Sequence, residues 1–190
     1  MEKYHRRSIR LKGYDYSQPG YYFKTVCTRE RECLLGEIFG SAMLLNEMGK
    51  MAERTWLEIS TYFPFVSIDK YMGMPNHFHG VIKIEAQNKR KDLYDCRGLM
   101  NQTPTPNQFP DDWILTKNPK ITLGKIIRFF KAKSALEIRN KMGNSFCWQR
   151  NYFEHIVRDK SELFRIREYI RDNPGNWPMD EDNPINGMKR

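Results

Sequence analysis

The sequence predicts an α+β protein built on a ferredoxin-like split β-α-β antiparallel sheet with an added C-terminal helix. Two observations lead to this prediction. Segments rich in aromatic and β-branched residues alternate with segments whose apolar residues recur at helical spacing. Their order is strand, helix, strand, strand, helix, strand and then a last helix, and the first six follow that fold. At 190 residues the chain has the length of one domain, so residues 1–190 are expected to form a single unit.

The first half of the chain is expected to supply three strands and one helix. Residues 21–28 are rich in aromatic and β-branched side chains and predict the first strand. Apolar residues spaced three or four positions apart predict a helix over residues 41–62. Residues 63–72 and 77–85 predict the next two strands, and the short turn between them, which contains Pro75, favours an antiparallel hairpin.

The second half is expected to begin with a loop. Residues 86–112 are polar and proline-containing, which predicts a flexible loop insertion. An amphipathic helix with one basic side is expected around residues 123–139, and residues 146–157 predict a strand or an irregular strand pair. The last helix is expected to begin at Asp159, whose carboxylate suits an N-cap, and to end at Asn173, because a residue before proline avoids helical geometry.

The charge of the chain indicates a polyanionic partner. Lys and Arg outnumber Asp and Glu by 32 to 23, a formal net charge of +9, and nucleic acid is the commonest partner of such chains. The alternative is that this charge serves solubility alone. Residues 1–20 are expected to form a basic N-terminal arm, with Tyr14 and Tyr16 exposed for stacking on unpaired bases. The cations expected to contact phosphates are Arg6, Arg7, Arg10, Lys12, Lys125 and Arg128.

Two classes of protein are disfavoured by the sequence. It holds no run of about 18 apolar residues, so no transmembrane helix is expected. Its four cysteines form no Cys-x-x-Cys pair, which disfavours a structural zinc site and suits a reducing cytoplasm.

His77-Phe78-His79 is the first candidate for a functional site. Alternate residues of a strand share a face, so the two imidazoles would project together near the surface while Phe78 enters the core. Two neutral imidazoles side by side can bind a divalent metal, with at least one further ligand from elsewhere in the chain. The alternative is a pair of half-exposed strand histidines that bind nothing.

The last predicted helix offers the second part of such a site. Tyr169 and Asn173 are four residues apart and therefore lie on one face of that helix. A tyrosine can act as a covalent nucleophile where a metal polarises the group that it attacks, and the amide oxygen of Asn173 could supply the further ligand. The alternatives are that Tyr169 is a packing residue and Asn173 an ordinary helix-end residue. Tyr152 competes as nucleophile, but it lies in a predicted strand and has no ligand four residues on.

Several motifs in order resemble the HUH-class single-tyrosine transposases, in particular their REP-associated branch. The matching segments are Arg6 to Ser17, Met74-Pro-Asn-His-Phe-His79, Trp148-Gln149, Tyr152-Phe-Glu-His155, Arg158 and Tyr169-Ile-Arg-Asp-Asn-Pro174. The resemblance implies the HUH endonuclease fold, with His77, His79 and Asn173 binding Mg²⁺ or Mn²⁺ and Tyr169 as the nucleophile. Some members have glutamine in place of the asparagine. The positions of Gln149, His155 and Arg158 match the family without an assigned role.

The resemblance also implies an activity and its partners. Such an enzyme cleaves and rejoins single-stranded DNA near hairpins through a 5′-phosphotyrosine intermediate, for DNA transposition or the processing of repeats. We expect a cytoplasmic, nucleoid-associated protein that is a monomer or a homodimer. Two other functions stay open: a non-catalytic nucleic-acid-binding module on the same fold, and a metal-dependent nuclease that uses water and forms no covalent intermediate.

Overall fold

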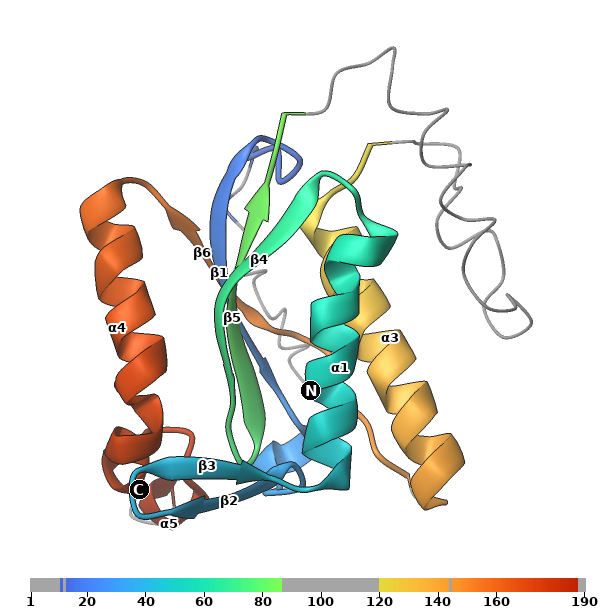
Figure 1. Cartoon of the computed structure of the whole chain (residues 1–190), viewed down its shortest axis with the longest axis vertical. Helices are drawn as coiled ribbons and strands as arrows, with labels where there is room; N and C mark the ends of the chain where they lie inside the picture. The colour runs from blue at the N-terminus through green and yellow to red at the C-terminus, as the bar shows by residue number, and fades with distance from the viewer. Residues whose placement is uncertain (1–10, 12, 87–119, 144, 188–190) are drawn as a thin grey trace, which may run out of the picture.

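A four-stranded antiparallel sheet with helices on both faces forms the body of the protein (Figure 1). The computed structural model describes residues 11, 13–86, 120–143 and 145–187. In spatial order the strands are β4 (Val66–Gly73), β5 (His77–Ile84), β1 (Gly20–Cys27) and β6 (Phe153–Val157). Every neighbouring pair is antiparallel, and β4 and β5 form the expected hairpin. The predicted fold class is confirmed.

One face of the sheet carries α1 (Glu47–Tyr62) and α3 (Leu123–Met142), and the main core lies between them and the strands (Figure 1). Trp56 of α1 is fully buried at its centre, with its ring centroid 5.0 Å from those of both Phe78 and Phe130. Gly80 makes room for this indole, because a Cβ atom there would lie 2.2 Å from Trp56 Cζ2. Alternate residues of β5 thus face this core, as expected of Phe78.

The other face of the sheet is covered by α4 (Lys160–Asn176). Phe23, Val81, Leu163 and Ile170 form a second, smaller apolar cluster between this helix and the strands. The Arg167 side chain of α4 also donates two hydrogen bonds to the Asp69 carboxylate of β4, from Nε at 2.7 Å and from Nη2 at 2.5 Å. Apolar packing and this ion pair hold α4 over the face that carries the odd-numbered residues of β5.

The start of α4 agrees with the sequence, and its end does not. Asp159 is the N-cap, and its Oδ1 accepts a hydrogen bond of 2.8 Å from the Glu162 amide. The expected end at Asn173 is wrong, because the helix continues through Pro174 to Asn176. Pro174 lies in the last turn of the helix, so only Gly175 and Asn176 follow it and the lost amide removes one backbone hydrogen bond near the helix end. A short 3₁₀ turn (Trp177–Met179) and α5 (Pro184–Gly187) follow.

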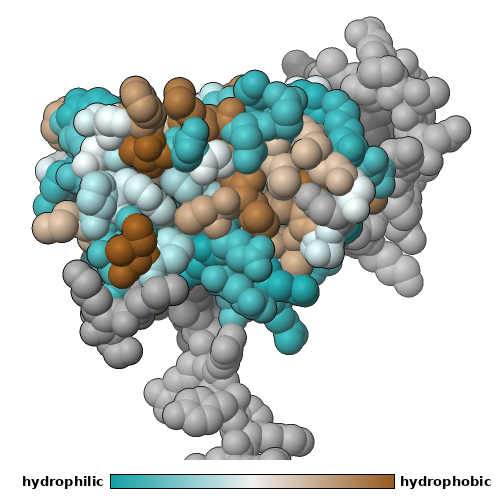
Figure 2. Space-filling view, turned by 90° about the horizontal axis from the view of Figure 1, so that it is seen from below, coloured by the Kyte–Doolittle hydropathy of each residue, from teal (hydrophilic) through white to brown (hydrophobic). Residues whose placement is uncertain are grey.

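Two further elements differ from the prediction. The helix expected over residues 41–62 begins at Glu47, where the Asn46 side chain accepts from the Gly49 amide at 3.0 Å. Before it, β2 (Gly36–Phe39) and β3 (Ala42–Leu45) form a hairpin that the sequence analysis missed. The end of the molecule with this hairpin and α5 shows scattered apolar surface (Figure 2).

The strand expected over residues 146–157 is shorter, since only Phe153–Val157 joins the sheet.

Some predictions fall on parts of the chain that the structure does not describe. They include the basic arm cations Arg6, Arg7, Arg10 and Lys12, and all but the first residue of the expected loop insertion 86–112. Among the described residues, no helix is both long and apolar enough to cross a membrane.

Candidate active site

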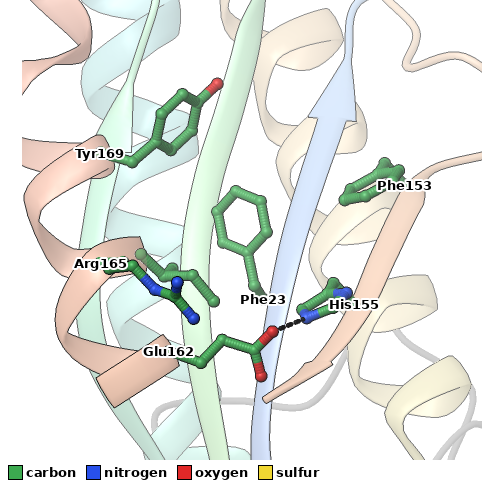
Figure 3. Close-up of a pocket in the computed structure, with 7 residues that line it drawn as sticks. Phe23, Phe153, His155, Glu162, Arg165 and Tyr169 are labelled. Carbon is green, nitrogen blue, oxygen red and sulfur yellow. Dashed lines mark hydrogen bonds and ion pairs between the residues drawn. The ribbon is translucent and has the colours of Figure 1, made fainter. Parts of the chain in front are cut away.

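Tyr169 lies on the side of α4 that faces the sheet (Figure 3). Its ring centroid is 5.4 Å from that of His79 and 6.0 Å from that of Phe23, and both contacts are edge to face. The residue is nevertheless 47% exposed, so a large substrate can reach it. Burial of its inner part raises the pKa of the Tyr169 hydroxyl to about 12, and the nearby carboxylates of Asp180 and Asp182 add to this shift. The phenol is therefore protonated at neutral pH.

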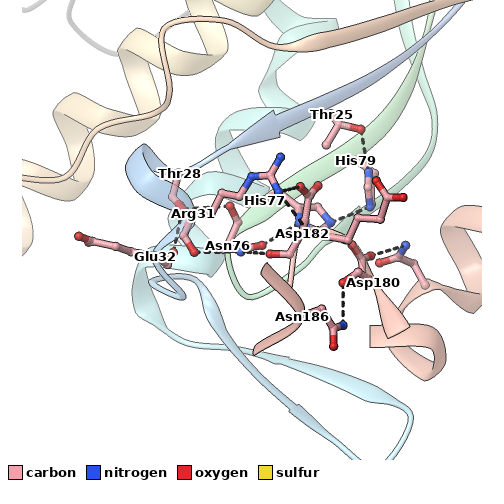
Figure 4. Close-up of polar contacts among 12 residues, drawn as sticks. Thr25, Thr28, Arg31, Glu32, Asn76, His77, His79, Asp180, Asp182 and Asn186 are labelled. Atoms are coloured by element: carbon pink, nitrogen blue, oxygen red, sulfur yellow. Dashed lines mark hydrogen bonds and ion pairs between the residues drawn. The ribbon is translucent and has the colours of Figure 1, made fainter. Parts of the chain in front are cut away.

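His77 and His79 begin β5 and project together from the face covered by α4 (Figure 4). Their Nε2 atoms lie 2.7 Å apart. The shared orientation follows from the two-residue period of a strand, as expected. The expectation of a surface position is wrong, because His77 is 0% and His79 2% exposed. The segment after α4 contributes to this burial, since the Trp177 ring centroid lies 5.9 Å from that of His77.

The hydrogen-bond partners of the two rings decide which nitrogens can bind a cation. His77 Nδ1 lies 2.8 Å from Asn76 Oδ1, and the Asn76 Nδ2 atom donates to the carbonyls of Arg31 and Asp182. These carbonyls fix the orientation of the amide, so its oxygen accepts from His77 Nδ1–H and leaves a lone pair on His77 Nε2. Such a bond to the far nitrogen is typical of histidines that bind metals.

His79 has a partner that permits either protonation of its ring. Its Nδ1 lies 3.0 Å from the Thr25 hydroxyl, and Thr25 is its Cα partner on β1. When that hydroxyl donates, His79 Nε2 carries the proton and can donate to His77. When that hydroxyl accepts, both Nε2 atoms present lone pairs toward the same point. Rotation of one hydroxyl, together with a shift of the His79 ring proton from Nε2 to Nδ1, thus converts a bonded histidine pair into two ligand atoms.

Burial keeps both imidazoles neutral. The pKa of His77 is lowered to about 3, chiefly by burial and further by the Arg31 guanidinium. The pKa of His79 is lowered well below its ordinary value, first by burial and then by His77. The neutral ring is the form that binds a metal.

Asn173 lies one turn beyond Tyr169 and is 1% exposed. Its Nδ2 atom donates to Asp180 Oδ2 at 3.3 Å, whereas its Oδ1 atom is buried and has no hydrogen-bond partner among the described residues. An unpaired buried oxygen costs free energy, so an ordered water or a bound ion is its expected partner. The same side chain is near enough to raise the pKa of His79 and to lower the pKa of Tyr169, as a minor contribution in each case. The structure therefore brings together all four residues that the sequence selected.

These residues fit a divalent cation bound by two imidazoles and an amide oxygen. In the described part of the chain, no group of three or more His, Cys, Asp or Glu side chains could hold a metal. An amide oxygen is a further type of donor that a cation accepts, and Asn173 Oδ1 is such an atom. Imidazole nitrogens suit Zn²⁺, Fe²⁺ and Ni²⁺, and an amide oxygen suits Mg²⁺ or Mn²⁺, so this donor set is compatible with several divalent metals.

Two acidic residues of the site were missed. Asp180 bonds Asn173, and Asp182 Oδ2 lies 3.8 Å from His77 Nδ1. Both come from the segment after α4, for which the sequence predicts no element. The run Asp180-Glu-Asp182 in a basic chain was the signal that could have found them.

Other predicted residues lie away from this site. Tyr152, the competing nucleophile, packs against the core on the α1 and α3 side of the sheet. Lys125 and Arg128 belong to α3 on that same side. The expectation that Tyr14 and Tyr16 are exposed is wrong, because both are half-buried against the main core. Their rings pack edge to face with centroids 4.9 Å apart.

Two relatives are similar to the chain in sequence, and no protein-family model matches it. An uncharacterized protein of Haemophilus influenzae is 40% identical over 178 residues, which span 94% of this chain and 93% of the relative. A second Haemophilus influenzae protein, with the provisional name REP-associated tyrosine transposase, is 22% identical over 160 residues, or 84% of this chain and 73% of the relative.

Two solved structures show a weaker overall likeness. A REP-associated tyrosine transposase bound to a REP hairpin has a TM-score of 0.49 and 16% identity, over 88% of this chain and 73% of its own. A protein from Deinococcus radiodurans, provisionally named a transposase, has a TM-score of 0.38 and 13% identity, over 86% of this chain and 95% of its own. The chain belongs to the family of the 40% identical Haemophilus influenzae protein, and the expected resemblance to the REP-associated tyrosine transposases is confirmed.

Proposed function

We propose that the protein is a single-stranded DNA nicking and joining enzyme that uses Tyr169 as its nucleophile and a divalent cation bound by His77, His79 and Asn173. One observation carries the proposal. The ring centroid of the half-exposed Tyr169 lies 5.4 Å from that of His79 in the buried histidine pair, and one helical turn away Asn173 Oδ1 has no hydrogen-bond partner among the described residues. These are the parts that metal-assisted covalent attack on a phosphate requires.

The covalent step follows from the position and the protonation of the tyrosine. The Tyr169 oxygen attacks the phosphorus atom, the bond from phosphorus to the 3′ oxygen breaks, and a 5′-phosphotyrosine forms. Because the phenol has a pKa of about 12, it gives up its proton during attack, and the departing 3′ oxygen gains one to become a hydroxyl. A cation at the imidazoles and Asn173 would supply Lewis acidity toward the phosphate. Attack by a second 3′-hydroxyl reverses the step and joins two strands.

The proposed substrate is single-stranded DNA that carries a hairpin. Its support is the family resemblance together with the net charge of +9, which favours a polyanion. Tyr169 is also the exposed member of the site, since it is 47% exposed and both histidines are buried. A flexible single strand can place one phosphate at such a position more readily than a stiff duplex.

A denaturing-gel assay tests the proposal. Labelled single-stranded hairpin DNA from the flanks of the protein's own gene is mixed with the wild type, with Tyr169→Phe or with Tyr152→Phe, in Mg²⁺, Mn²⁺ or EDTA. We expect a cation-dependent covalent adduct with the wild type and with Tyr152→Phe, and none with Tyr169→Phe.

The other outcomes would contradict the proposal in different ways. Cleavage without an adduct, retained in Tyr169→Phe, would show a nuclease that uses water. Binding of the hairpins without cleavage or adduct, in every cation tested, would show a nucleic-acid-binding module.

A further inference from the structure

Beside Tyr169 lies a shallow hollow of about 300 Å³ between α4 and the strands β1 and β6 (Figure 3). Phe23 and Phe153 form its apolar wall, with ring centroids 6.2 Å apart and the rings edge to face. Phe23 is 8% exposed, whereas Phe153 is 52% exposed. A large aromatic ring is thus held open to solvent next to the proposed nucleophile.

A carboxylate closes the other end of the hollow. Glu162 Oε1 lies 2.8 Å from His155 Nε2, and Glu162 Oε2 accepts from the Arg158 amide at 2.7 Å. The Arg158 amide, with a further contribution from His155, lowers the pKa of Glu162, so this carboxylate stays ionised at neutral pH. A fixed negative charge disfavours a phosphate deep in the hollow. It favours an uncharged flat ring that carries hydrogen-bond donors on its edge.

Arg165 supplies a cation at the rim. Its guanidinium points toward the hollow from α4 (Figure 3), and it is exposed. Among the described residues it takes part in no ion pair or hydrogen bond, although Arg167 and Arg171 on the same helix are paired with Asp69 and Glu168. An unpaired arginine beside an aromatic surface can hold a backbone phosphate.

We propose that this hollow seats one unpaired nucleobase of the DNA strand, stacked on Phe153, with the adjoining backbone phosphate at Arg165. Tyr169 lines the same hollow, so the seated base belongs to a nucleotide next to the phosphate that the tyrosine attacks. The Glu162 carboxylate favours a base with an exocyclic amino group, so adenine, cytosine or guanine is expected there rather than thymine. The position of the base relative to cleavage rests on the function proposed above, but the binding of the base does not.

A double-mutant cycle, which combines an abasic site in the DNA with a substitution of Phe153, tests the base seat without any cleavage. The full chain with Tyr169→Phe is titrated in EDTA into labelled hairpin strands that carry an abasic site at each flanking position in turn, at one fixed salt concentration. We expect the abasic site to weaken binding by about 5- to 100-fold at one position, in line with stacking on an aromatic side chain. Adding Phe153→Leu should weaken binding of the intact strand similarly and should remove the effect of that abasic site.

Matched variants on α4 separate the base seat from a general loss of affinity. Phe164→Leu changes a phenylalanine that is 62% exposed and does not line the hollow, so its abasic profile should equal that of the parent. Arg165→Gln should weaken binding of every strand and lower the slope of log affinity against log salt by about 1, whereas Arg171→Gln should not. Thermal melting checks that each variant is folded.

The proposal is overturned if no flanking position couples to Phe153, or if Phe153→Leu and Phe164→Leu behave alike. Coupling without any covalent adduct would keep the base seat and reject the nicking function. A covalent adduct without coupling would keep the nicking function and reject the base seat.

Discussion

The buried ion pair between Lys24 and Glu154 leads to a quantitative prediction about stability. The two residues face each other across β1 and β6, and Lys24 Nζ lies 2.7 Å from Glu154 Oε2. Their side chains are 0% and 4% exposed. The ammonium also lies 4.9 Å from the centre of the Tyr152 ring. We expect Glu154→Leu to destabilise the protein strongly, because it leaves a buried ammonium without its carboxylate.

The magnitude follows from the geometry. At 2.7 Å and an effective dielectric constant of about 20, the attraction is about 6 kcal/mol, and the desolvation of two buried ions offsets much of it. Removal of one partner leaves the desolvation of the other uncompensated. Either Glu154→Leu or Lys24→Met should therefore lower the free energy of unfolding by about 3–5 kcal/mol. The double variant should cost less than about 2 kcal/mol, since apolar groups of similar size replace both charges.

Urea unfolding followed by circular dichroism measures all four members of this cycle. The expected coupling energy between the two substitutions is at least about 3 kcal/mol, because each single variant suffers from the charge that the other removes. If the two losses add, or if each single variant loses less than about 1 kcal/mol, the pair is not buried as described and the reasoning is refuted.

Three further predictions concern the sheet, the helix and the cation. Gly80→Ala should lower the free energy of unfolding by about 1–3 kcal/mol or more, measured in urea, because its Cβ would lie 2.2 Å from Trp56 Cζ2. Hydrogen bonds from Arg167 lower the pKa of Asp69, so this pair stabilises the protein above the unfolded pKa and is lost as pH falls through the lower folded value. Asp69→Asn should therefore reduce the loss of stability between about pH 5 and pH 3, and an unchanged pH profile would contradict the role of the pair. Mn²⁺ at 100 times its dissociation constant should stabilise the wild type by about 2.7 kcal/mol, which thermal melting detects as a rise in melting temperature. The same Mn²⁺ concentration should raise the melting temperature of Asn173→Ala by less. Equal rises would exclude Asn173 as a ligand.

The order of the elements was predictable because its signals are local. The turn and apolar run that predict His77–Ile84 and the helical spacing over Leu123–Met142 depend only on near neighbours in sequence. The β2–β3 hairpin gave no such signal. Two of its apolar residues, Phe39 and Leu44, are 78% and 52% exposed, so apolar character there does not report burial. The helix expected over residues 41–62 therefore includes the residues of β3.

The residues of the candidate site could be predicted from the sequence, but their burial could not. His77 with His79 and Tyr169 with Asn173 were selected by spacings that hold within one strand or one helix. The burial of the histidines depends instead on the segment after α4, which returns to them through Trp177 and Asp182. Contacts of this kind join residues about a hundred positions apart, and no local pattern encodes them.

The two faces of β5 show why the site depends on strand register. The strand turns Phe78 and Gly80 toward α1 and α3, and it turns His77 and His79 toward α4. A shift by one residue would exchange the two sets, placing imidazoles in the apolar core and a phenyl ring at Tyr169. Gly80 opposes that shift, since the space occupied by Trp56 admits no side chain at this point of the strand. Gly80, which leaves room for Trp56 in the core, therefore also determines that His77 and His79 are the side chains of β5 on the Tyr169 side of the sheet.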